Sequence, residues 1–283
     1  MNLGTTLLLG TIAGITILLG MPVGRMRGNR PVLQLFLNAI AIGVLLFLVW
    51  DVLSGAWEPL DARLAAVHED TGGMGPVFGY GALFVGGLTV GLLGLVGYDR
   101  YLHTKAGSAP EVGPGAASVK ESLPASGIAS WSAGRRLALL IAVGIGLHNF
   151  AEGLAIGQSA ARDEVALATV LVVGFALHNA TEGFGIVAPL AAAGERASWG
   201  FLLTMALIGG GPTFVGTWIG HGFTSDPVSV VFLTLAAGSI VYVVCQLLGV
   251  ASRARRMDVL ALGILVGMVA GFATDAIVTI GGA

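Results

Sequence analysis

The sequence predicts an all-α, polytopic membrane protein, and three observations support this fold class. Of its 283 residues, 55% are hydrophobic and only 11% are charged, whereas soluble domains carry about 25% charged residues. Several apolar stretches exceed the roughly 20 residues that a helix needs to cross a bilayer. The 45 glycines suit close helix packing in lipid, where small residues let backbones approach. A single cysteine, Cys245, excludes a disulfide framework.

Eight apolar runs are long enough to be transmembrane helices, and together they form a single transmembrane domain. We expect the first run to be a retained helix and not a signal peptide, because no Lys or Arg precedes it and three arginines follow it. In chain order, we predict the helices at 3–21, 31–53, 77–97, 137–160, 165–190, 199–220, 228–250 and 258–280.

The loops between these helices carry an uneven distribution of basic residues. The first, third, fifth and seventh loops contain three, five, one and three Lys or Arg residues, and the remaining loops contain only Arg63 and Arg162. The positive-inside rule therefore predicts a multi-pass protein of the plasma (inner) membrane with both termini outside. The outer loops are acidic, which either concentrates cations at the outer mouth or reflects ordinary loop solubility.

The longest inner loop, residues 104–134, separates the third helix from the fourth. It is rich in Ala, Gly, Ser and Pro and has no apolar periodicity. This composition predicts a flexible cytoplasmic linker. It contains no histidine, so it does not resemble a metal-collecting tract.

Two related motifs interrupt the apolar helices: HNFAEGLAIG from His148 and HNATEGFGI from His178. In each motif, His and Glu are four residues apart and so share one helix face. The histidines are equally far from the turn at 162–164, about 22 Å along each helix, which places both near the membrane centre. We expect small residues to let these two helices approach each other, namely Gly153, Gly157, Gly183 and Gly185.

The paired motifs predict a buried site for a divalent cation. Glu152 and Glu182 face low dielectric, and neither helix contains a Lys or Arg that would neutralise them. Protonation or a bound cation must therefore compensate the two carboxylates. Imidazole, carboxylate and amide groups suit Zn(II), Fe(II), Mn(II) or Co(II). The candidate metal ligands are His148, Asn149, Glu152, His178, Asn179 and Glu182.

These motifs resemble those in the fourth and fifth helices of the ZIP family of divalent-metal transporters, and the resemblance extends over nearly the whole chain. It implies a 3+2+3 arrangement of eight helices and no enzymatic activity. It also implies that zinc, with iron, manganese, cobalt or cadmium as further candidates, moves toward the cytoplasm through a binuclear site. The His and Glu residues of both motifs would be ligands, and Asn149 and Asn179 would belong to the second subsite.

The chain departs from the family pattern at four positions. Ala151 and Thr181 stand where proline usually precedes the motif glutamate. Gly211 precedes Pro212 where the family often has a glutamate, and Gln246 stands where a glutamate is common. We therefore expect a weakened second subsite, so that the resting protein holds one tightly bound ion rather than two, and a less acidic inner exit.

Four further residues are candidates for the ion pathway. Asp51 and Asp275 fall near the outer ends of their helices, where they either pass an ion inward or extend to interfacial water. Pro212 breaks a backbone hydrogen bond near mid-membrane, and the freed carbonyl is a candidate cavity lining. Gln246 belongs to the inner exit.

Two alternatives to metal transport remain at this stage. Paired His and Glu residues in a bundle also hold di-iron centres, which would indicate a membrane metalloenzyme. The same residues could relay protons in a carrier of another solute. The expected partners are a divalent metal ion and the lipid bilayer but not nucleic acid, and a homodimer is one candidate assembly.

Overall fold

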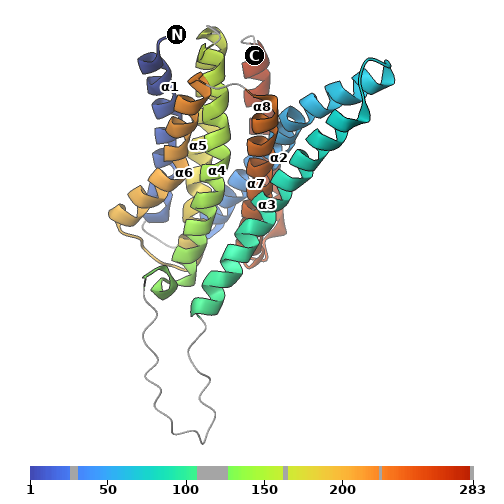
Figure 1. Ribbon diagram of the computed structural model, residues 1–283. Coiled ribbons are helices and arrows are strands. Elements are labelled where there is room, and N and C mark those ends of the chain that lie inside the picture. The colour runs from blue at the N-terminus through green and yellow to red at the C-terminus, as the bar shows by residue number, and fades with distance from the viewer. Residues whose placement is uncertain (26–30, 107–126, 162–164, 223–224, 281–283) are drawn as a thin grey trace, which may run out of the picture.

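A computed structural model describes residues 1–25, 31–106, 127–161, 165–222 and 225–280 as eight α-helices and three short 3-10 helices (Figure 1). The predicted fold class, an all-α polytopic membrane protein, is confirmed: seven helices within these ranges are long and apolar enough to cross a membrane. The α-helices are α1 (Leu3–Ile15), α2 (Pro31–His68), α3 (Met74–Ala106), α4 (Ala133–Ala161), α5 (Val165–Ala192), α6 (Trp199–Gly222), α7 (Asp226–Ser252) and α8 (Met257–Ile280).

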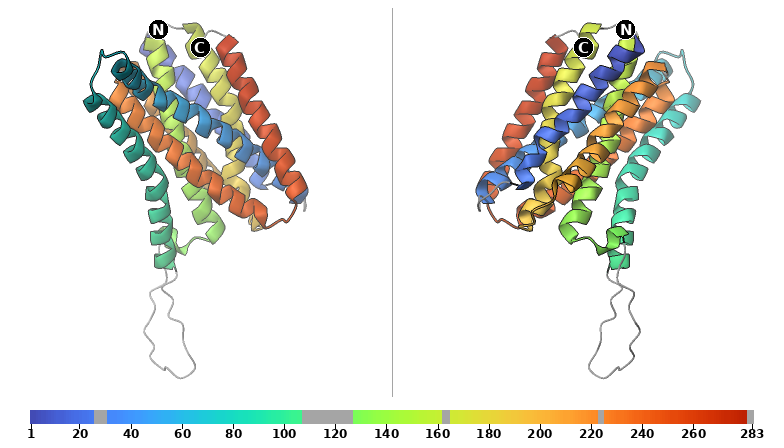
Figure 2. Two further views of the ribbon diagram at one scale, coloured as in Figure 1. Left: turned by 90° about the vertical axis from the view of Figure 1, so that its right-hand side faces the viewer. Right: turned by 90° about the vertical axis from the view of Figure 1, so that its left-hand side faces the viewer.

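The helices pack into two groups that meet along α4 and α5. One group contains α1, α4, α5 and α6, and the other pairs α2 with α8 and α3 with α7. Figure 2 shows both groups from the side. The start of α1 and the end of α8 lie at one end of the bundle, and the end of α3 and the start of α4 lie at the other (Figure 1). We call these the terminal end and the loop end.

The first helix is shorter than predicted, because α1 ends at Ile15 and two 3-10 helices follow it, η1 (Thr16–Leu19) and η2 (Met21–Arg25). The carbonyl of Ala13 accepts hydrogen bonds from Thr16 Oγ1 at 2.6 Å and from Asn179 Nδ2 at 3.0 Å. Side chains therefore compete for a carbonyl that a continuing helix would use. A close approach of Gly20 to Gly183 then holds this segment against α5.

The second helix is longer than predicted and continues to His68 despite Pro59 and several charged residues. Its extension is amphipathic: Ala56 and Leu60 are buried, while Glu58 and Asp61 are exposed. The sequence prediction ended this helix where the residues cease to be uniformly apolar. The periodicity of one buried face shows why it continues.

The predicted linker at 104–134 lies mostly outside the described residues. At its edges, α3 continues to Ala106, and a 3-10 helix, η3, covers Gly127–Ser130. The loop-end start of α4 is fixed to the α5–α6 connection, since Arg135 Nε and Ser132 Oγ both donate to the Glu195 carboxylate at 2.5 Å.

The glycines of the two motifs do not bring α4 and α5 together, so that expectation was wrong. A Cβ at Gly153 would collide with the Thr213 carbonyl oxygen of α6, and one at Gly157 with that of Thr217. Gly183 instead faces η1, and Gly185 faces α7 and α2. Backbone contact therefore joins α4 to α6 and α5 to η1, which leaves space between the α4 and α5 motif faces for polar side chains.

Candidate metal site in the membrane

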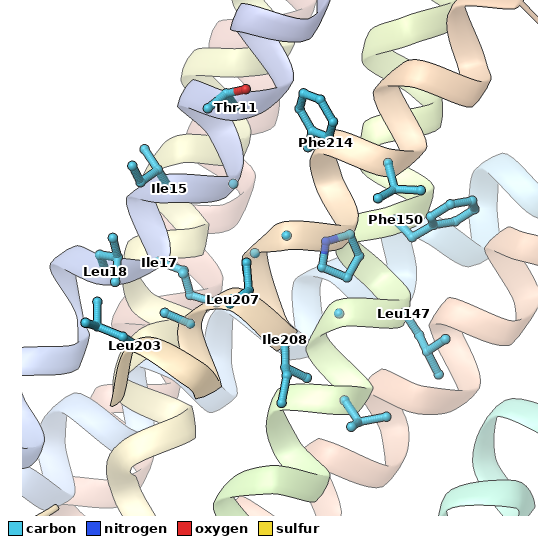
Figure 3. A pocket seen from close by; sticks show the side chains of 18 of the residues that line it. Thr11, Ile15, Ile17, Leu18, Leu147, Phe150, Leu203, Leu207, Ile208 and Phe214 are labelled. Carbon is cyan, nitrogen blue, oxygen red and sulfur yellow. The ribbon is translucent and has the colours of Figure 1, made fainter. Parts of the chain in front are cut away.

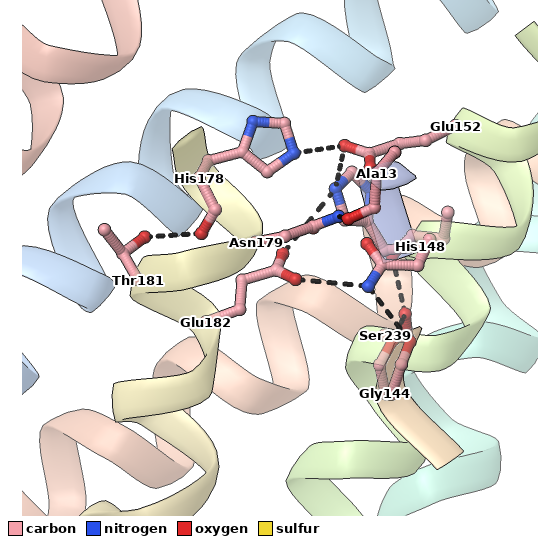
Figure 4. A network of polar contacts seen from close by, with 12 residues as sticks. Ala13, Gly144, His148, Glu152, His178, Asn179, Thr181, Glu182 and Ser239 are labelled. Carbon is pink, nitrogen blue, oxygen red and sulfur yellow. Dashed lines mark hydrogen bonds and ion pairs between the residues drawn. The ribbon is translucent and has the colours of Figure 1, made fainter. Parts of the chain in front are cut away.

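The His and Glu side chains of the two motifs converge between α4 and α5. Glu152 Oε1 lies 2.9 Å from His148 Nε2 and 2.5 Å from His178 Nε2 (Figure 4). Glu182 Oε1 lies 3.8 Å from His148 Nε2. Ligand atoms of His148, Glu152 and His178 all lie within 4.8 Å of one another, a spacing that one metal ion can bridge. We call the four residues the cage.

Helix geometry explains the convergence. Residues four apart lie on one helix face, so His148 and Glu152 leave α4 together, and His178 and Glu182 leave α5 together. The two helices are antiparallel and meet at the terminal end (Figure 1). Figure 4 shows the Glu152 carboxylate directed at the His178 ring from the facing helix.

The cage contains more buried acceptor oxygens than donors. Asn149 Nδ2 donates to Glu182 Oε2 at 3.3 Å and to the Gly209 carbonyl at 3.0 Å, which uses both of its N–H groups. Within the two motifs, four buried oxygens have no hydrogen-bond donor among the described residues, namely Glu152 Oε2, Glu182 Oε1, Asn149 Oδ1 and Asn179 Oδ1. Leaving such groups unsatisfied costs about 1–3 kcal/mol each. A cation bound here would supply the positive charge that these oxygens lack, so the ligand set fits a divalent metal.

The two asparagines have structural partners as well as available oxygens. The Asn149 amide nitrogen joins α4 to α5 and α6, and that of Asn179 holds the Ala13 carbonyl of α1. Their nitrogens are thereby fixed, while their oxygens remain without hydrogen-bond donors. This is the orientation that an amide needs in order to coordinate a cation through oxygen.

Gly211 and Pro212 do not face the cage. Both line an apolar groove on the outer surface of α1, α4 and α6 (Figure 3). A Cβ at Gly211 would lie 3.3 Å from Leu207 Cδ1, and Leu207 is 72% exposed. The carbonyl of Ile208, which Pro212 leaves without its helical donor, abuts Gly146 of α4. Pro212 therefore shapes the α4–α6 contact, and its freed carbonyl does not line an ion cavity.

The position of Gly211 predicts the effect of placing a carboxylate there. Gly211→Glu is expected to leave the metal content of the purified protein unchanged, because its side chain would point toward lipid. It is also expected to lower thermal stability, since an isolated carboxylate in hydrocarbon is costly. Elemental analysis and thermal denaturation of both forms provide the measurements. An additional bound ion per chain in the variant would contradict this geometry.

Asp51 and Asp275 lie on the terminal-end side of the cage. A cavity of about 260 Å³ is lined by both carboxylates together with His148, Glu152 and His178. We call it the outer cavity. Asp51 is close enough to Asp275 and to these three cage residues to interact with them electrostatically. The structure therefore brings both predicted pathway acids into one cavity with three of the cage residues.

Gln246, which we predicted at the inner exit, is half-buried on α7 and lines neither the outer cavity nor the cavity at the loop end. Sequence reasoning also missed three residues that line cavities, namely Thr274 at the outer cavity and Gln34 and Asn38 at the loop end. Asn38 could have been identified from the sequence, because an amide within the apolar run LFLNAIAIG is costly to bury without a role.

A buried His/Glu cage inside a bundle of membrane-spanning helices defines the class of metal-handling polytopic membrane proteins. Comparison with known proteins identifies the family. The family model described as ZIP Zinc transporter matches residues 98–279. Proteins described as Zinc transporter ZupT in Salmonella heidelberg (strain SL476) and Salmonella newport (strain SL254) are 34% identical over 239 residues. The alignment covers 83% of this chain and 79% of each relative. The chain belongs to the ZIP zinc transporter family.

Proposed function

We propose that this protein carries zinc across the plasma membrane toward the cytoplasm, through the cage between α4 and α5. The observation that carries the proposal is the surplus of buried acceptor oxygens around two imidazoles. Neutral imidazole and carboxylate are typical zinc ligands, and family membership supports the same substrate. Iron, manganese, cobalt and cadmium are further candidate substrates, since such a ligand set does not select one metal by affinity alone.

In this proposal His148, Glu152, His178 and Glu182 bind the ion, and the oxygens of Asn149 and Asn179 complete its coordination. Glu152 is the central ligand because its Oε1 already contacts both imidazoles. We propose one tightly bound ion, since ligand atoms of His148, Glu152 and His178 all lie within 4.8 Å of one another, a spacing that one ion can bridge. Both chain termini lie outside, so the outer cavity opens toward the source of the metal. The homodimer remains a candidate assembly on which this mechanism does not depend.

Uptake into proteoliposomes with an entrapped zinc indicator tests the proposed function. Zinc should enter, and the purified protein should retain zinc that is lost when Glu152 is replaced. Metal binding without flux would favour a membrane metalloenzyme instead. Flux of another solute in the absence of metal would favour a proton-coupled carrier. Either result would refute zinc transport.

The outer cavity predicts a specific kinetic defect. Replacing both pathway acids, Asp51→Asn with Asp275→Asn, should raise the KM for zinc about threefold to tenfold with little change in maximal rate. The reason is that the two charges concentrate cations beside the cage, an effect of about this size or larger. The KM should also become less sensitive to salt, because salt screens the attraction between these two carboxylates and the cation, and the variant lacks both charges.

Asp258→Asn is the matched control, since Asp258 lies at the loop-end start of α8 and pairs with Arg256 at 2.8 Å. It should leave the KM unchanged. A double variant with the wild-type KM would show that Asp51 and Asp275 do not recruit the ion.

A further inference from the structure

A second cavity, of about 520 Å³, lies at the loop end of the bundle, and we call it the inner cavity. The starts of α2 and α4 and the ends of α5 and α7 enclose it. Its polar side chains are Gln34, Asn38 and Arg253. No carboxylate is present among the described residues that line it, in contrast to the outer cavity with Asp51, Glu152 and Asp275.

Asn38 is the only fully buried polar side chain in this lining, being 4% exposed. Its Nδ2 donates to the Leu247 carbonyl of α7 at 3.4 Å, and its Oδ1 is buried with no hydrogen-bond donor. Gln34 lies one helical turn nearer the loop end on the same face of α2. Burying an amide oxygen without a donor is unfavourable, so the wall of the inner cavity holds an oxygen suited to a ligand that supplies positive charge.

The inner cavity approaches the cage along α5. Its lining includes Phe184 and Ala188, and Ala188 is about 9 Å along the helix from Glu182. Between them, the fully buried Leu247 packs over Gly185: a Cβ placed at Gly185 would lie 3.3 Å from Leu247 Cδ1. Leu247 is not among the described residues that line the cavity, and its carbonyl is the one that Asn38 holds.

We propose that the inner cavity is the exit chamber for the transported cation and that Asn38 supplies the first oxygen ligand beyond the cage. This inference rests on the proposed function. An uncharged amide oxygen binds a zinc ion weakly compared with the imidazoles and carboxylates of the cage. Arg253 at the same lining repels the cation. The chamber therefore passes the ion onward without retaining it.

The first test replaces Asn38 and separates binding from release. Asn38→Leu should lower the maximal uptake rate about tenfold, as expected for the loss of one contact to a charged group. The affinity of the cage for zinc should stay the same. Asn38→Ser, which keeps an oxygen, should recover most of the rate. A wild-type maximal rate in Asn38→Leu would overturn the proposal.

Asn38→Asp provides the opposite change. A carboxylate at this position should create a second, weaker zinc site in equilibrium binding and should slow uptake, because the charge retains the ion. Unchanged stoichiometry together with an unchanged rate would count against the exit chamber.

A third measurement does not depend on the Asn38–Leu247 hydrogen bond or on how well the Asn38 variants fold. In a Cys245→Ala background, Gln34→Cys should react with a water-soluble thiol reagent applied from the cytoplasmic side, and zinc under transport conditions should slow the reaction. A rate that zinc does not change would overturn the proposal. Glu152→Gln distinguishes failure of the proposed function from failure of the exit chamber. If this variant still transports zinc, the proposed function fails. If it is inactive while Asn38→Leu is normal, only the exit chamber fails.

Discussion

Glu152→Gln should abolish tight zinc binding and lower zinc uptake by about 100-fold or more. Glu152 Oε1 is the atom that both imidazoles approach, at 2.9 Å from His148 Nε2 and 2.5 Å from His178 Nε2. The amide keeps the size of the side chain but removes its charge. Loss of a partner that only orients a metal ligand already costs about 10–100-fold, so loss of the central ligand should cost at least as much.

Glu195→Gln is the matched control for this experiment. Glu195 is also a glutamate with close partners, but it pairs with Arg135 at the loop end, away from the cage. It should retain zinc stoichiometry and uptake. Metal content and proteoliposome uptake are measured for both variants. Full zinc content in Glu152→Gln would refute the cage as the binding site.

Gly153→Ala should destabilise the folded protein more than most single-methyl additions. The added Cβ would collide with the Thr213 carbonyl oxygen and would approach the Thr217 amide nitrogen at 2.9 Å. Both are backbone atoms of α6, so α4 and α6 must separate to accommodate it. Overpacking of this kind costs about 1–3 kcal/mol. The measurement is thermal denaturation of the purified protein in detergent.

Gly86→Ala on α3 is the control, because a Cβ there meets nothing within 4 Å. Its stability should be unchanged or slightly higher, since alanine favours a helix over glycine by about 0.5–1 kcal/mol. Equal stability of the two variants would show that the α4–α6 contact tolerates expansion.

The sequence predicted those structural features that depend on a single physical requirement. Apolar length predicted the helices and their membrane setting. The four-residue spacing predicted that His148 and Glu152 share a face, as do His178 and Glu182, since helix geometry alone determines it. The ends of α1 and α2 were less predictable. The end of α1 depends on a hydrogen bond from Asn179 on a distant helix. The end of α2 depends on one buried face, which the mean hydropathy of a segment does not reveal.

The direction in which a residue points was the least predictable property. Gly153 and Gly211 have no side chain to indicate a buried or exposed face. Its place within a motif suggested the wrong partner for Gly153, and the family resemblance suggested the wrong neighbours for Gly211. Only the packing of α6 shows that Gly153 contacts Thr213 and that Gly211 faces the outer apolar groove. Asn38 was missed for a related reason, because its cavity is formed by helices far apart in the chain.

The amide of Asn179 connects the proposed metal site to the first helix. Its nitrogen donates to the Ala13 carbonyl, at the point where α1 gives way to η1. When an amide oxygen is drawn toward a cation, electron density shifts from its nitrogen, and its N–H becomes a stronger donor, as in cooperative hydrogen-bond chains. Loading the site would thus tighten the Asn179–Ala13 hydrogen bond. The first helix, which contributes no charged group to the cage, would then respond to whether an ion is bound.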